Sequence, residues 1–473
     1  MIDQRKENCF MASEKTKFFG WLPRELSSEG PRYLALVNAL EQDVVENRLV
    51  DGSRLPPHRE LAAQIGLSVG TVSKAYQEAE QRGIVSSHVG QGTFVRRRAS
   101  TVPIGAAAPQ AVNMALNVPA HGREADVLSG LLSDVYRPQE LAPLLDYHPH
   151  SGIGHHREVI ARSISDDAFS VDPALLYLCN GAQHALDIAV RLVAQPGDKI
   201  LVDRLTYSGF KAIAVANSLT LVPVDLDDEG TDPDALEAAC RLSGARVYYS
   251  MPTLQSPTAR TMSLQRRKRI AELAEKLDLL IIEDDVYSFF YPERPLPIAA
   301  LVPERSFYAT SYSKCVAPGF RLGTLSVPPA FKGRAELFVH ASSWFAAPIL
   351  GDLAVRLLES GRLDELIRER RRQATERYRL FAKFFPFVEK LDNPPFYAWL
   401  PLPQEWSASR FTSAARGQGI LVTPPTASTV DDDDPGAVRV CLGAPDDLSE
   451  LSGALSILSE ILARPPLSVF SVA

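Results

Sequence analysis

Apolar residues at helical spacing dominate the first part of the chain. Within PRYLALVNALEQDVVENRL (31–49), Leu34, Val37 and Leu40 recur every third residue, and Pro31 stands where the first turn of a helix tolerates proline. The pattern predicts one helix across this stretch.

Two shorter helices and a hairpin are predicted next. His58–Ile65 and Thr71–Gln81 have helical spacing, and Gly66 between them can adopt the left-handed conformation that ends a helix. Two short helices joined by a glycine turn have the spacing of a helix-turn-helix. The following IVSSHVGQGTFV (84–95) indicates two short strands around a glycine-bearing turn, which is the pattern of a wing.

The second short helix has two different faces. Its residues at i, i+3, i+4 and i+7 are Val72, Ala75, Tyr76 and Ala79, which predict a buried stripe. The opposite face carries small polar groups suited to base edges or phosphates in a DNA major groove. These groups are Ser68, Gly70, Thr71, Ser73, Lys74 and Gln77, with Arg54, Arg59 and His88 as flanking candidates for phosphate contacts. The alternative is a small helical subdomain whose polar residues are simply solvated.

The string LPPHRELAAQIGLSVGTVSKAYQEAEQRGIVSSHVGQGTFV resembles the GntR-type winged helix over residues 31–98, including the LPxxRELA, TVxxAY and GxGTFV elements. The positions that the resemblance places at DNA are Arg54, Arg59, Ser68, Gly70, Thr71 and Gly92. GntR proteins generally carry arginine after the turn serine or threonine, where this chain has Val69. Valine can contact a thymine methyl group but cannot read guanine bidentately, so the operator sequence cannot be inferred by analogy.

Beyond residue 112 the pattern changes to short apolar runs that alternate with amphipathic helical segments. This rhythm predicts an α/β fold with a mostly parallel sheet, whose buried strands are continuous hydrophobic runs. The runs are KILV (199–202), RVYYS (246–250), LLIIED (279–284) and SFYATSYS (306–313). We therefore predict a winged-helix domain at 20–98, a linker at 99–111 and a larger domain at 112–473, with a small α+β subdomain from about 330 to 473.

Composition and charge fit this division. The chain has 473 residues, 45% hydrophobic and 23% charged, which is typical of folded domains and too long for one core. The net charge of −7 divides into +2 for residues 1–98 and −9 for the rest, so DNA contact is expected at the N-terminus. No apolar stretch has the length of a signal peptide or a membrane span, so we expect a cytoplasmic protein without membrane contact, starting at Met1 or Met11.

The cysteines give no sign of a metal site or of a disulfide framework. They stand at 9, 179, 240, 315 and 441, without a CxxC or CxH pair. The simplest expectation is five buried thiols and no metal.

Two motifs of the larger domain offer the groups that a pyridoxal phosphate site needs. SYSKCVAPGFRLGTL (311–325) supplies Lys314 to form an aldimine, with Ser311 and Arg321 able to reach a phosphate. LLIIEDDVYSFF (279–290) supplies Asp284, whose buried charge a pyridinium would balance, and Tyr287, which can donate to a ring oxygen.

A third motif predicts a phosphate cradle. LCNGAQHALDIAV (178–190) is a strand, a glycine turn and a helix, so the amides of Ala182 and Gln183 lie where a helix N-terminus binds anions, and Gly181 allows close approach. Tyr207, after the next strand, is a candidate to stack on a ring, although a half-buried core tyrosine is the simpler interpretation.

The order of these motifs over residues 113–460 resembles the class I aminotransferases of fold type I. The resemblance implies pyridoxal 5'-phosphate as cofactor, with the aldimine at Lys314, the pyridine nitrogen at Asp284 and the phenolic oxygen at Tyr287. The residues implied at the ring face and the phosphate are Tyr207, Gly181, Ala182, Gln183, Ser311 and Arg321. The fold implied is a large domain with a mostly parallel seven-stranded sheet and a small C-terminal α+β domain.

Two further positions match the same family. Tyr147, in YHPHSG, matches the tyrosine that such enzymes lend to the phosphate across a dimer. Arg439, in VRVCLG, matches the arginine that clamps a substrate carboxylate, for which a bidentate fork is suited. One segment departs from the family: MPTLQSPTAR (251–260) has Ser256 and Ala259 where aminotransferases usually have asparagine and glycine, which puts efficient turnover in doubt.

A GntR-type head fused to an aminotransferase-like body resembles the MocR family of bacterial regulators. The resemblance implies a homodimer that binds double-stranded operator DNA and senses an amino compound or a vitamin B6 species in the body. One alternative is a working aminotransferase with a DNA-binding head, favoured by Lys314, Asp284 and Arg439. Another is a DNA-binding protein whose body only dimerises, which would not need Lys314 and Asp284 together.

Overall fold

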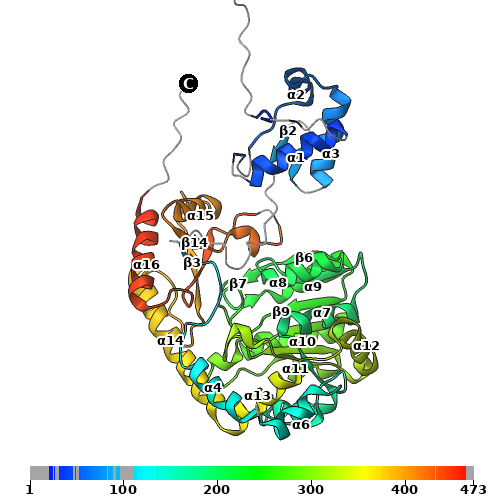
Figure 1. Cartoon of the computed structure of the whole chain (residues 1–473), viewed down its shortest axis with the longest axis vertical. Coiled ribbons are helices and arrows are strands. Elements are labelled where there is room, and N and C mark those ends of the chain that lie inside the picture. Colours follow the sequence, from blue (N-terminus) through cyan, green and yellow to red (C-terminus); the bar gives the residue numbers. More distant parts are fainter. Residues whose placement is uncertain are drawn as a thin grey trace, which may run out of the picture. The chain divides into compact units, whose positions relative to one another are not determined.

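The computed structural model divides the chain into two compact units, residues 1–106 and 107–473. Figure 1 shows the helices and strands of both. The structure describes residues 21–24, 26, 31–45, 48–49, 53–81, 84–88, 92–95, 111–135, 137–431 and 433–464. Apart from residue 111, the predicted linker 99–111 lies outside the described residues, as does Cys9.

The described residues of the first unit form three helices and a hairpin. Its elements are α1 (Arg32–Val45), α2 (His58–Ile65), α3 (Val69–Gln81), β1 (Val85–His88) and β2 (Gly92–Val95). The strands pair antiparallel, as predicted for a wing. Gly66 ends α2 with φ 67°, the predicted left-handed conformation.

The helix α3 begins two residues before the predicted start. The hydroxyl of Ser68 accepts from the backbone N–H of Thr71 at 3.1 Å and contacts the Thr71 hydroxyl at 2.8 Å. This bond satisfies one of the free amides of the first turn, so the helix starts at Val69.

The core of this unit is formed by the predicted apolar positions. The α3 residues Val72, Ala75, Tyr76 and Ala79 are all buried, and Leu61 of α2 is 0% exposed. Burial of a leucine side chain contributes roughly 1.5–3 kcal/mol, so a few such residues hold this small unit together. The two polar groups at its edge are paired, because Tyr76 donates to the Pro56 carbonyl at 2.9 Å and Trp21 donates to Asp43 at 2.6 Å.

The second unit is built on a seven-stranded sheet in the order β4-β12-β11-β10-β9-β5-β6. Its strands are β4 (Leu176–Cys179), β5 (Lys199–Asp203), β6 (Thr220–Val224), β9 (Val247–Ser250), β10 (Leu280–Asp284), β11 (Ser306–Ser311) and β12 (Gly323–Ser326). Only β12 runs antiparallel to its neighbours, so the predicted mostly parallel sheet is confirmed.

Successive strand residues pack on opposite faces of this sheet, which places different helices on each face. Ile200 and Val202 join a cluster with α7 (Ala182–Val193), α8 (Ser208–Ala216) and α12 (Lys332–Ser343). Leu201, between them, joins a cluster with α9 (Pro233–Ser243), α10 (Leu264–Leu277) and α11 (Ile298–Leu301). The strands are therefore buried on both sides, which explains their continuous apolar runs.

A third cluster lies on the β4 side of the sheet. It includes side chains of α4 (Glu124–Val135), α6 (Gly154–Ile164), α13 (Pro348–Glu359) and the first turns of α14 (Arg362–Phe384). The short helix α5 is Pro138–Leu141, and β7 (Leu226–Asp227) pairs with β8 (Gly230–Thr231). The short 3-10 helices are Ala142–Leu145, Pro173–Leu175, Ser288–Phe290, Pro303–Arg305, Pro318–Phe320, Pro329–Phe331 and Pro425–Ala427.

A smaller subdomain packs around two short strand pairs. Its elements are β3 (Val112–Met114) parallel to β14 (Ile420–Val422), β13 (Tyr397–Pro401) antiparallel to β15 (Ala437–Cys441), and the helices α15 (Ala408–Gly417) and α16 (Leu448–Ala463). Its core also takes side chains from the end of α14. The helices α12 and α13 share their core contacts with the large sheet. Judged by these contacts, the small subdomain contains fewer residues than the predicted range 330–473.

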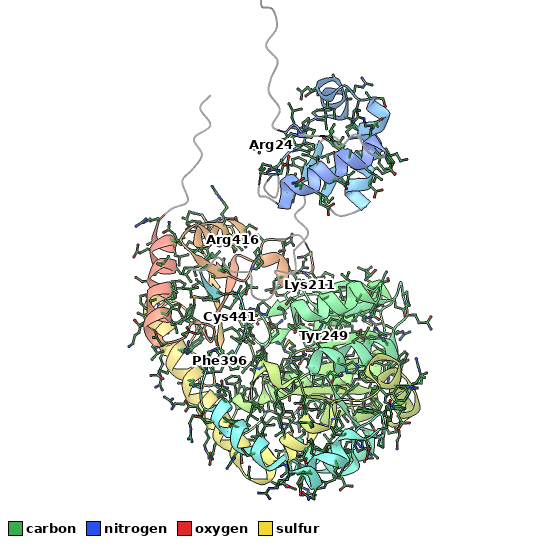
Figure 2. The ribbon with its side chains drawn as sticks, in the orientation of Figure 1. Arg24, Lys211, Tyr249, Phe396, Arg416 and Cys441 are labelled. Carbon is green, nitrogen blue, oxygen red and sulfur yellow. The ribbon has the colours of Figure 1, made fainter. Side chains whose placement is uncertain are left out.

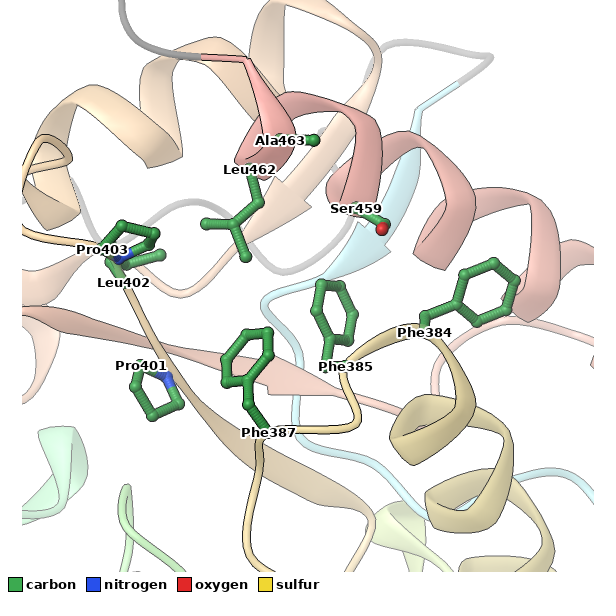
Figure 3. A pocket seen from close by; sticks show the side chains of 9 residues that line it. All are labelled: Phe384, Phe385, Phe387, Pro401, Leu402, Pro403, Ser459, Leu462 and Ala463. Atoms are coloured by element: carbon green, nitrogen blue, oxygen red, sulfur yellow. The ribbon is translucent and has the colours of Figure 1, made fainter.

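An apolar groove of about 480 Å³ opens on the small subdomain (Figure 3). Its lining residues are Phe384, Phe385, Phe387, Pro401, Leu402, Pro403, Ser459, Leu462 and Ala463. The groove lies where the ends of α14, β13 and α16 meet.

Among the described residues, no single helix has both the length and the apolar composition of a membrane span. The helices Pro329–Ser343 and Pro348–Glu359, which meet at a bend, reach that length and composition only when taken together. The four described cysteines are buried and free. Within the same residues, no group of three or more His, Cys, Asp or Glu side chains is placed to hold a metal ion.

Candidate functional site

Lys314 lies in the turn that follows β11. Its Nζ donates a hydrogen bond to the backbone carbonyl of Asn117 at 2.5 Å. Burial, followed by the nearby Arg439, lowers the pKa of Lys314 to about 8. A lysine with a lowered pKa is a better nucleophile at neutral pH, because more of it is uncharged.

Asp284 ends β10, directly on the carboxyl edge of the sheet. Its Oδ2 accepts from the Tyr249 hydroxyl at 3.1 Å, and its Oδ1 is buried without a hydrogen-bond partner among the described residues. Burial raises the pKa of Asp284 to about 7, and the neighbouring Asp285 adds to the rise. Tyr249 is fixed in turn by a stack on Phe210, with ring centroids 3.6 Å apart; Figure 2 labels Tyr249.

The three adjacent carboxylates of this strand have different partners. Glu283 accepts from the backbone N–H groups of Ile298 and Ala299 at 3.1 and 2.8 Å, which are the first amides of α11. Asp285 accepts from the Tyr308 hydroxyl at 2.5 Å. Glu283 is therefore engaged in the fold through both oxygens. Asp284 and Asp285 each keep a buried Oδ1 without a hydrogen-bond partner among the described residues, and Asp284 is the one of the two whose charge acts on Lys314 and Tyr207.

Tyr287 follows the same strand and is 4% exposed. Its hydroxyl accepts from the side-chain amide of Asn117 at 2.7 Å, and its ring centroid is 6.0 Å from the Lys314 Nζ. Burial raises the pKa of Tyr287, so the phenol stays protonated and can donate.

Arg321 and the glycine turn before α7 form a close-packed cradle. A Cβ on Gly181, which has φ 79°, would lie 2.5 Å from an Arg321 Nη atom, so glycine is required there. The Arg321 guanidinium donates to the Asn180 carbonyl and to the Ser313 hydroxyl, both at 3.3 Å. Arg321 is exposed. Its guanidinium lies beside the N-terminus of α7, where free backbone N–H groups favour a bound anion.

The predicted phosphate residues Ala182 and Ser311 lie around the same cradle. Ala182 is the first residue of α7, whose N-terminus has no side-chain cap. The hydroxyl of Ser311 bonds to the hydroxyl of Ser313 at 3.0 Å, and Ser313 is the serine that contacts Arg321. Ser313 was not singled out in the sequence, although it stands in the same SYSK string.

Tyr207 and Gln183 contact each other at the start of α8. The Tyr207 hydroxyl donates to Gln183 Oε1 at 3.3 Å, and Gln183 Nε2 donates to the Gly209 carbonyl at 2.7 Å. A Cβ on Gly209 would lie 2.4 Å from the Tyr207 ring, so the glycine makes room for it. Burial, followed by the charge of Asp284, raises the pKa of Tyr207. The phenol therefore lies close enough to Asp284 for the two groups to interact electrostatically.

Arg439 points from β15 of the small subdomain. It is 8% exposed, and it donates to the hydroxyls of Ser256 and Thr423 at 3.0 and 3.2 Å. Ser256, the residue that departs from the family pattern, thus contacts the guanidinium. The same strand carries the buried Cys441, labelled in Figure 2.

The ring contacts of Tyr147 are with residues other than the predicted site residues. Tyr147 is 84% exposed, and its ring contacts Trp344 and Phe345 with centroids 5.7 and 6.3 Å away. Its predicted role belongs to a dimer, and a single chain does not test it.

One segment of the small subdomain is bonded to the loop that carries Tyr207. We call residues 425–431 the strap. Its Ser428 carbonyl accepts from the Thr206 N–H at 2.8 Å, and its Val430 N–H donates to the Arg204 carbonyl at 3.0 Å. Lys211, labelled in Figure 2, donates to the Thr426 carbonyl at 2.7 Å, and Arg204 forms an ion pair with Asp431.

The predicted DNA contacts lie on the surface of the first unit. Arg54, Arg59, Ser68, Gly70 and Lys74 are exposed, and Thr71 is half-buried. Val69 is also exposed, at 43%. A Cβ on Gly92 would lie 3.0 Å from Arg54 Nε, so the wing strand and Arg54 are adjacent.

Two side-chain contacts on this surface were not predicted. The Lys74 Nζ lies 4.2 Å above the Tyr33 ring, which orients the lysine. His58 Nδ1 and the Ser73 hydroxyl are 2.8 Å apart, which joins α2 to α3. The side chain of His88 lies outside the described residues.

Two site residues could not be recognised from the sequence, for the same reason. Asn117 and Tyr249 stand in ordinary strings, LNVPA and RVYYS, and only their contacts with Lys314, Tyr287 and Asp284 reveal them. The one signal in the sequence was that a buried carboxylate and a buried phenol each need a hydrogen-bond partner.

Comparison with protein families gives two matches that divide the chain in the same way. Residues 109–455 match the family described as aminotransferase class I and II, and residues 32–95 match bacterial regulatory proteins of the gntR family.

Relatives of similar length carry both parts. An HTH-type transcriptional regulator of Bacillus subtilis, YdeF, is 30% identical over 453 residues, covering 93% of this chain and 96% of that protein. YdcR of Escherichia coli, also described as an HTH-type transcriptional regulator, is 25% identical, covering 83% and 91%. Both are described as uncharacterized.

Solved structures resemble the body. LysN, the alpha-aminoadipate aminotransferase of Thermus thermophilus complexed with N-(5'-phosphopyridoxyl)-L-leucine, superposes with a TM-score of 0.68 at 21% identity, covering 75% of this chain and 92% of that chain. A kynurenine aminotransferase of Pyrococcus horikoshii gives 0.67 at 22% identity, covering 75% and 91%. At these identities the likeness concerns the fold.

Proposed function

The chain belongs to the aminotransferase class I and II family and carries a gntR-family head, and from this premise we propose that it is a transcriptional regulator that senses an amino compound or a B6 vitamer through bound pyridoxal 5'-phosphate. The head binds double-stranded DNA and the body binds the cofactor. The reasons for each half are different.

The observation that carries the cofactor half is the state of Asp284, which, like Asp285, has a buried oxygen without a partner among the described residues but is the one of the two whose charge acts on Lys314 and Tyr207. A carboxylate buried with one oxygen unpartnered is costly, because desolvation of a charge is not repaid. A protonated ring nitrogen at Oδ1 would supply the missing donor and the opposite charge. The glycine cradle at Gly181 and the exposed guanidinium of Arg321 fit the phosphate at the other end.

The chain's own residues then have distinct tasks. Lys314 attaches the cofactor covalently, Tyr287 donates to its ring oxygen, and Tyr207 covers the ring. Gly181, Ala182, Gln183, Ser311 and Arg321 surround the phosphate, and Tyr147 of a second copy completes that site in a homodimer. When bound, the cofactor supplies an aldehyde that reacts reversibly with amines and an electron-withdrawing ring.

Arg439 defines the class of effector. Its guanidinium is buried to 8% exposure and oriented by two hydroxyls, so a carboxylate can bind it bidentately with little competition from water. An effector that carries both an amine and a carboxylate therefore fits a site that holds Lys314 and Arg439.

The head supports DNA binding by its shape and its exposed groups. The N-terminus of α3 presents Ser68, Gly70 and Thr71 on the surface, and Arg54, Arg59 and Lys74 add positive charge near it. Hydroxyls and amides at a helix N-terminus suit phosphates and base edges, and the cations supply salt-dependent affinity.

A second candidate function is a working aminotransferase with a DNA-binding head. The joint presence of Lys314, Asp284 and Arg439 in one site favours it, because a pure scaffold needs none of the three. Sensing and turnover share the same first chemical step, so they differ only in the later steps.

The test is an absorbance spectrum of the purified full-length protein, wild type beside Lys314→Ala, followed by titration with an amino acid panel and binding to its own upstream DNA. A near-visible band that is absent from Lys314→Ala and shifts with one amino compound supports the sensor. Steady conversion of amino acid to keto acid would support the enzyme. A wild type that stays colourless after addition of pyridoxal phosphate refutes the cofactor half.

A further inference from the structure

We propose that Asn117 is a positioning residue of this site, which holds the Lys314 amino group with its backbone carbonyl and the Tyr287 hydroxyl with its side-chain amide. The inference rests on the proposed function, because the two groups serve a common purpose only when the cofactor lies between them. It assigns a role to a residue that lies outside the motifs of the site.

The geometry joins three distant segments through one residue. Lys314 Nζ donates to the Asn117 carbonyl at 2.5 Å across 197 residues of sequence, and Asn117 Nδ2 donates to the Tyr287 hydroxyl at 2.7 Å across 170 residues. A single residue therefore fixes the distance between the nucleophile and the phenol.

The segment that carries Asn117 is anchored on both sides. The carbonyl of Ala115 accepts from the Thr423 hydroxyl at 3.2 Å and from Arg439 at 3.4 Å. The carbonyl of Ala120 accepts from Arg370, whose side chain is 1% exposed. Asn117 lies between these anchors, so its position is set by the fold of the small subdomain and by α14.

Close backbone packing adds a third anchor. A Cβ on Gly443 would lie 1.9 Å from the Val118 carbonyl oxygen, so the segment passes against Gly443 at a distance that only glycine permits. A segment so tightly held places the Asn117 amide reproducibly, which a surface loop would not.

The direction of the amide bond determines what Tyr287 can do. An amide nitrogen only donates, so the Tyr287 oxygen accepts through a lone pair and keeps its own proton for donation to the cofactor ring oxygen. Ser256 carries no carboxamide, and its hydroxyl accepts from Arg439. The carboxamide at this site thus comes from Asn117 and not from position 256.

The first experiment compares Asn117→Ala with Leu116→Ala, a neighbouring residue that is 36% exposed. Pyridoxal phosphate is titrated into each full-length apoprotein and followed by absorbance. We expect Asn117→Ala to bind about five- to tenfold more weakly than wild type, the loss that corresponds to one buried hydrogen bond, and Leu116→Ala to bind like wild type.

The second experiment uses Asn117→Asp, which keeps the shape and the backbone carbonyl but places a carboxylate against the Tyr287 hydroxyl, whose ring centroid lies 6.0 Å from the lysine nitrogen. The carboxylate stabilises the protonated form of that nitrogen, so the pH midpoint of the cofactor absorbance should rise by about one unit, a tenfold change in the equilibrium. A residue with a purely structural role would not move this midpoint.

The outcomes separate this inference from the proposed function. If wild type does not take up pyridoxal phosphate, the proposed function fails first. If wild type and Leu116→Ala take it up, but Asn117→Ala binds equally well and Asn117→Asp keeps the wild-type midpoint, the assignment of Asn117 is wrong while the proposed function stands. Should Asn117→Ala fail to fold, as judged by circular dichroism, the Asn117→Asp midpoint decides alone.

Discussion

The head and the candidate cofactor site of the body are assembled in opposite ways. In the head, the paired buried polar groups stand close in sequence: Tyr76 bonds to Pro56 over 20 residues, and Trp21 bonds to Asp43 over 22. In the body, Lys314 bonds to Asn117 over 197 residues, and Arg439 bonds to Ser256 over 183. A local unit can be altered in one place, whereas the site depends on the whole body being folded.

The comparison also concerns charge. The head buries mainly apolar side chains around α1 and α3, and its candidate ligand groups are exposed. The body buries Asp203, Glu283, Asp284 and Asp285 within its sheet edge. Ligands of the head should therefore respond to salt, and ligands of the body to single buried charges.

The largest effect should come from the buried charge of the site. Asp284→Asn removes the counter-charge of a ring nitrogen, and loss of one partner of a buried pair costs about 3–5 kcal/mol, so cofactor affinity should fall by roughly a hundredfold to several thousandfold. Absorbance titration measures this affinity. Asp285→Asn is the matched control: it changes a carboxylate that bonds to Tyr308, and it should leave cofactor affinity near wild type. Equal losses in the two variants would contradict the different roles that we assign to them.

A core change in the head should break only the head. Leu61→Ala removes a side chain that is 0% exposed, and we expect about 3 kcal/mol less stability in this unit. DNA binding should be lost at a temperature where the cofactor spectrum is unchanged, as followed by fluorescence anisotropy and absorbance on one sample. Leu22→Ala, at an exposed leucine of the same unit, serves as the control. Simultaneous loss of the spectrum would show that the two units unfold together.

The buried carboxyl of Asp203 should make the stability of the body depend on pH. Burial raises its pKa to about 6, so the folded state holds a proton that the unfolded state releases near pH 4. The folded state binds more protons in this window, so stability is present below it and falls as pH rises towards 6, by about 2–3 kcal/mol in total. Urea unfolding between pH 4 and 7 measures the slope. Asp203→Asn should make the slope shallower without removing it, because the raised pKa values of Glu283 and Asp284 contribute with the same sign. An unchanged slope would rule out Asp203 as a contributor.

The smallest effect is expected at one phosphate contact of the head. Arg59→Ala should weaken DNA binding uniformly across sequences and reduce the slope of log affinity against log salt by about one. Arg162→Ala, an exposed arginine on α6 of the body, is the control. A change of sequence preference instead of salt slope would mean that Arg59 contacts a base.

Prediction from sequence succeeded where structure is local. The ends of α2, the left-handed Gly66 and the stripe of α3 follow from spacing and turn chemistry within a few residues. The four apolar runs located β5, β9, β10 and β11 within two residues at each end, because strands buried on both faces are continuous, whereas β6 and β12 were not located. The helix α3 begins two residues before the predicted start, because Ser68 caps its first turn.

Prediction from sequence fell short where partners are distant. Lys314, Asp284 and Arg321 stand in strings dense with functional groups, but Asn117 and Tyr249 acquire their roles from contacts made across the fold. The second hydroxyl of the SYSK string, Ser313, contacts Arg321, while Ser311 bonds to Ser313. Spacing along a chain cannot rank such neighbours, since their order is decided by tertiary packing.

The placement of β3 bears on how DNA binding and cofactor binding can be coupled. This strand, Val112–Met114, is the first described element after the head, it is held by β14, and Asn117 lies three residues beyond its end. The strand therefore stands, in sequence, between the head and the residue that contacts both the lysine and the phenol. Coupling between two binding sites is reciprocal. If occupancy of the cofactor site alters the affinity for DNA by some factor, bound DNA alters the affinity for the cofactor by the same factor. Operator DNA would then act as an effector of the cofactor site, and its effect would be measured as a change in cofactor affinity when DNA is added.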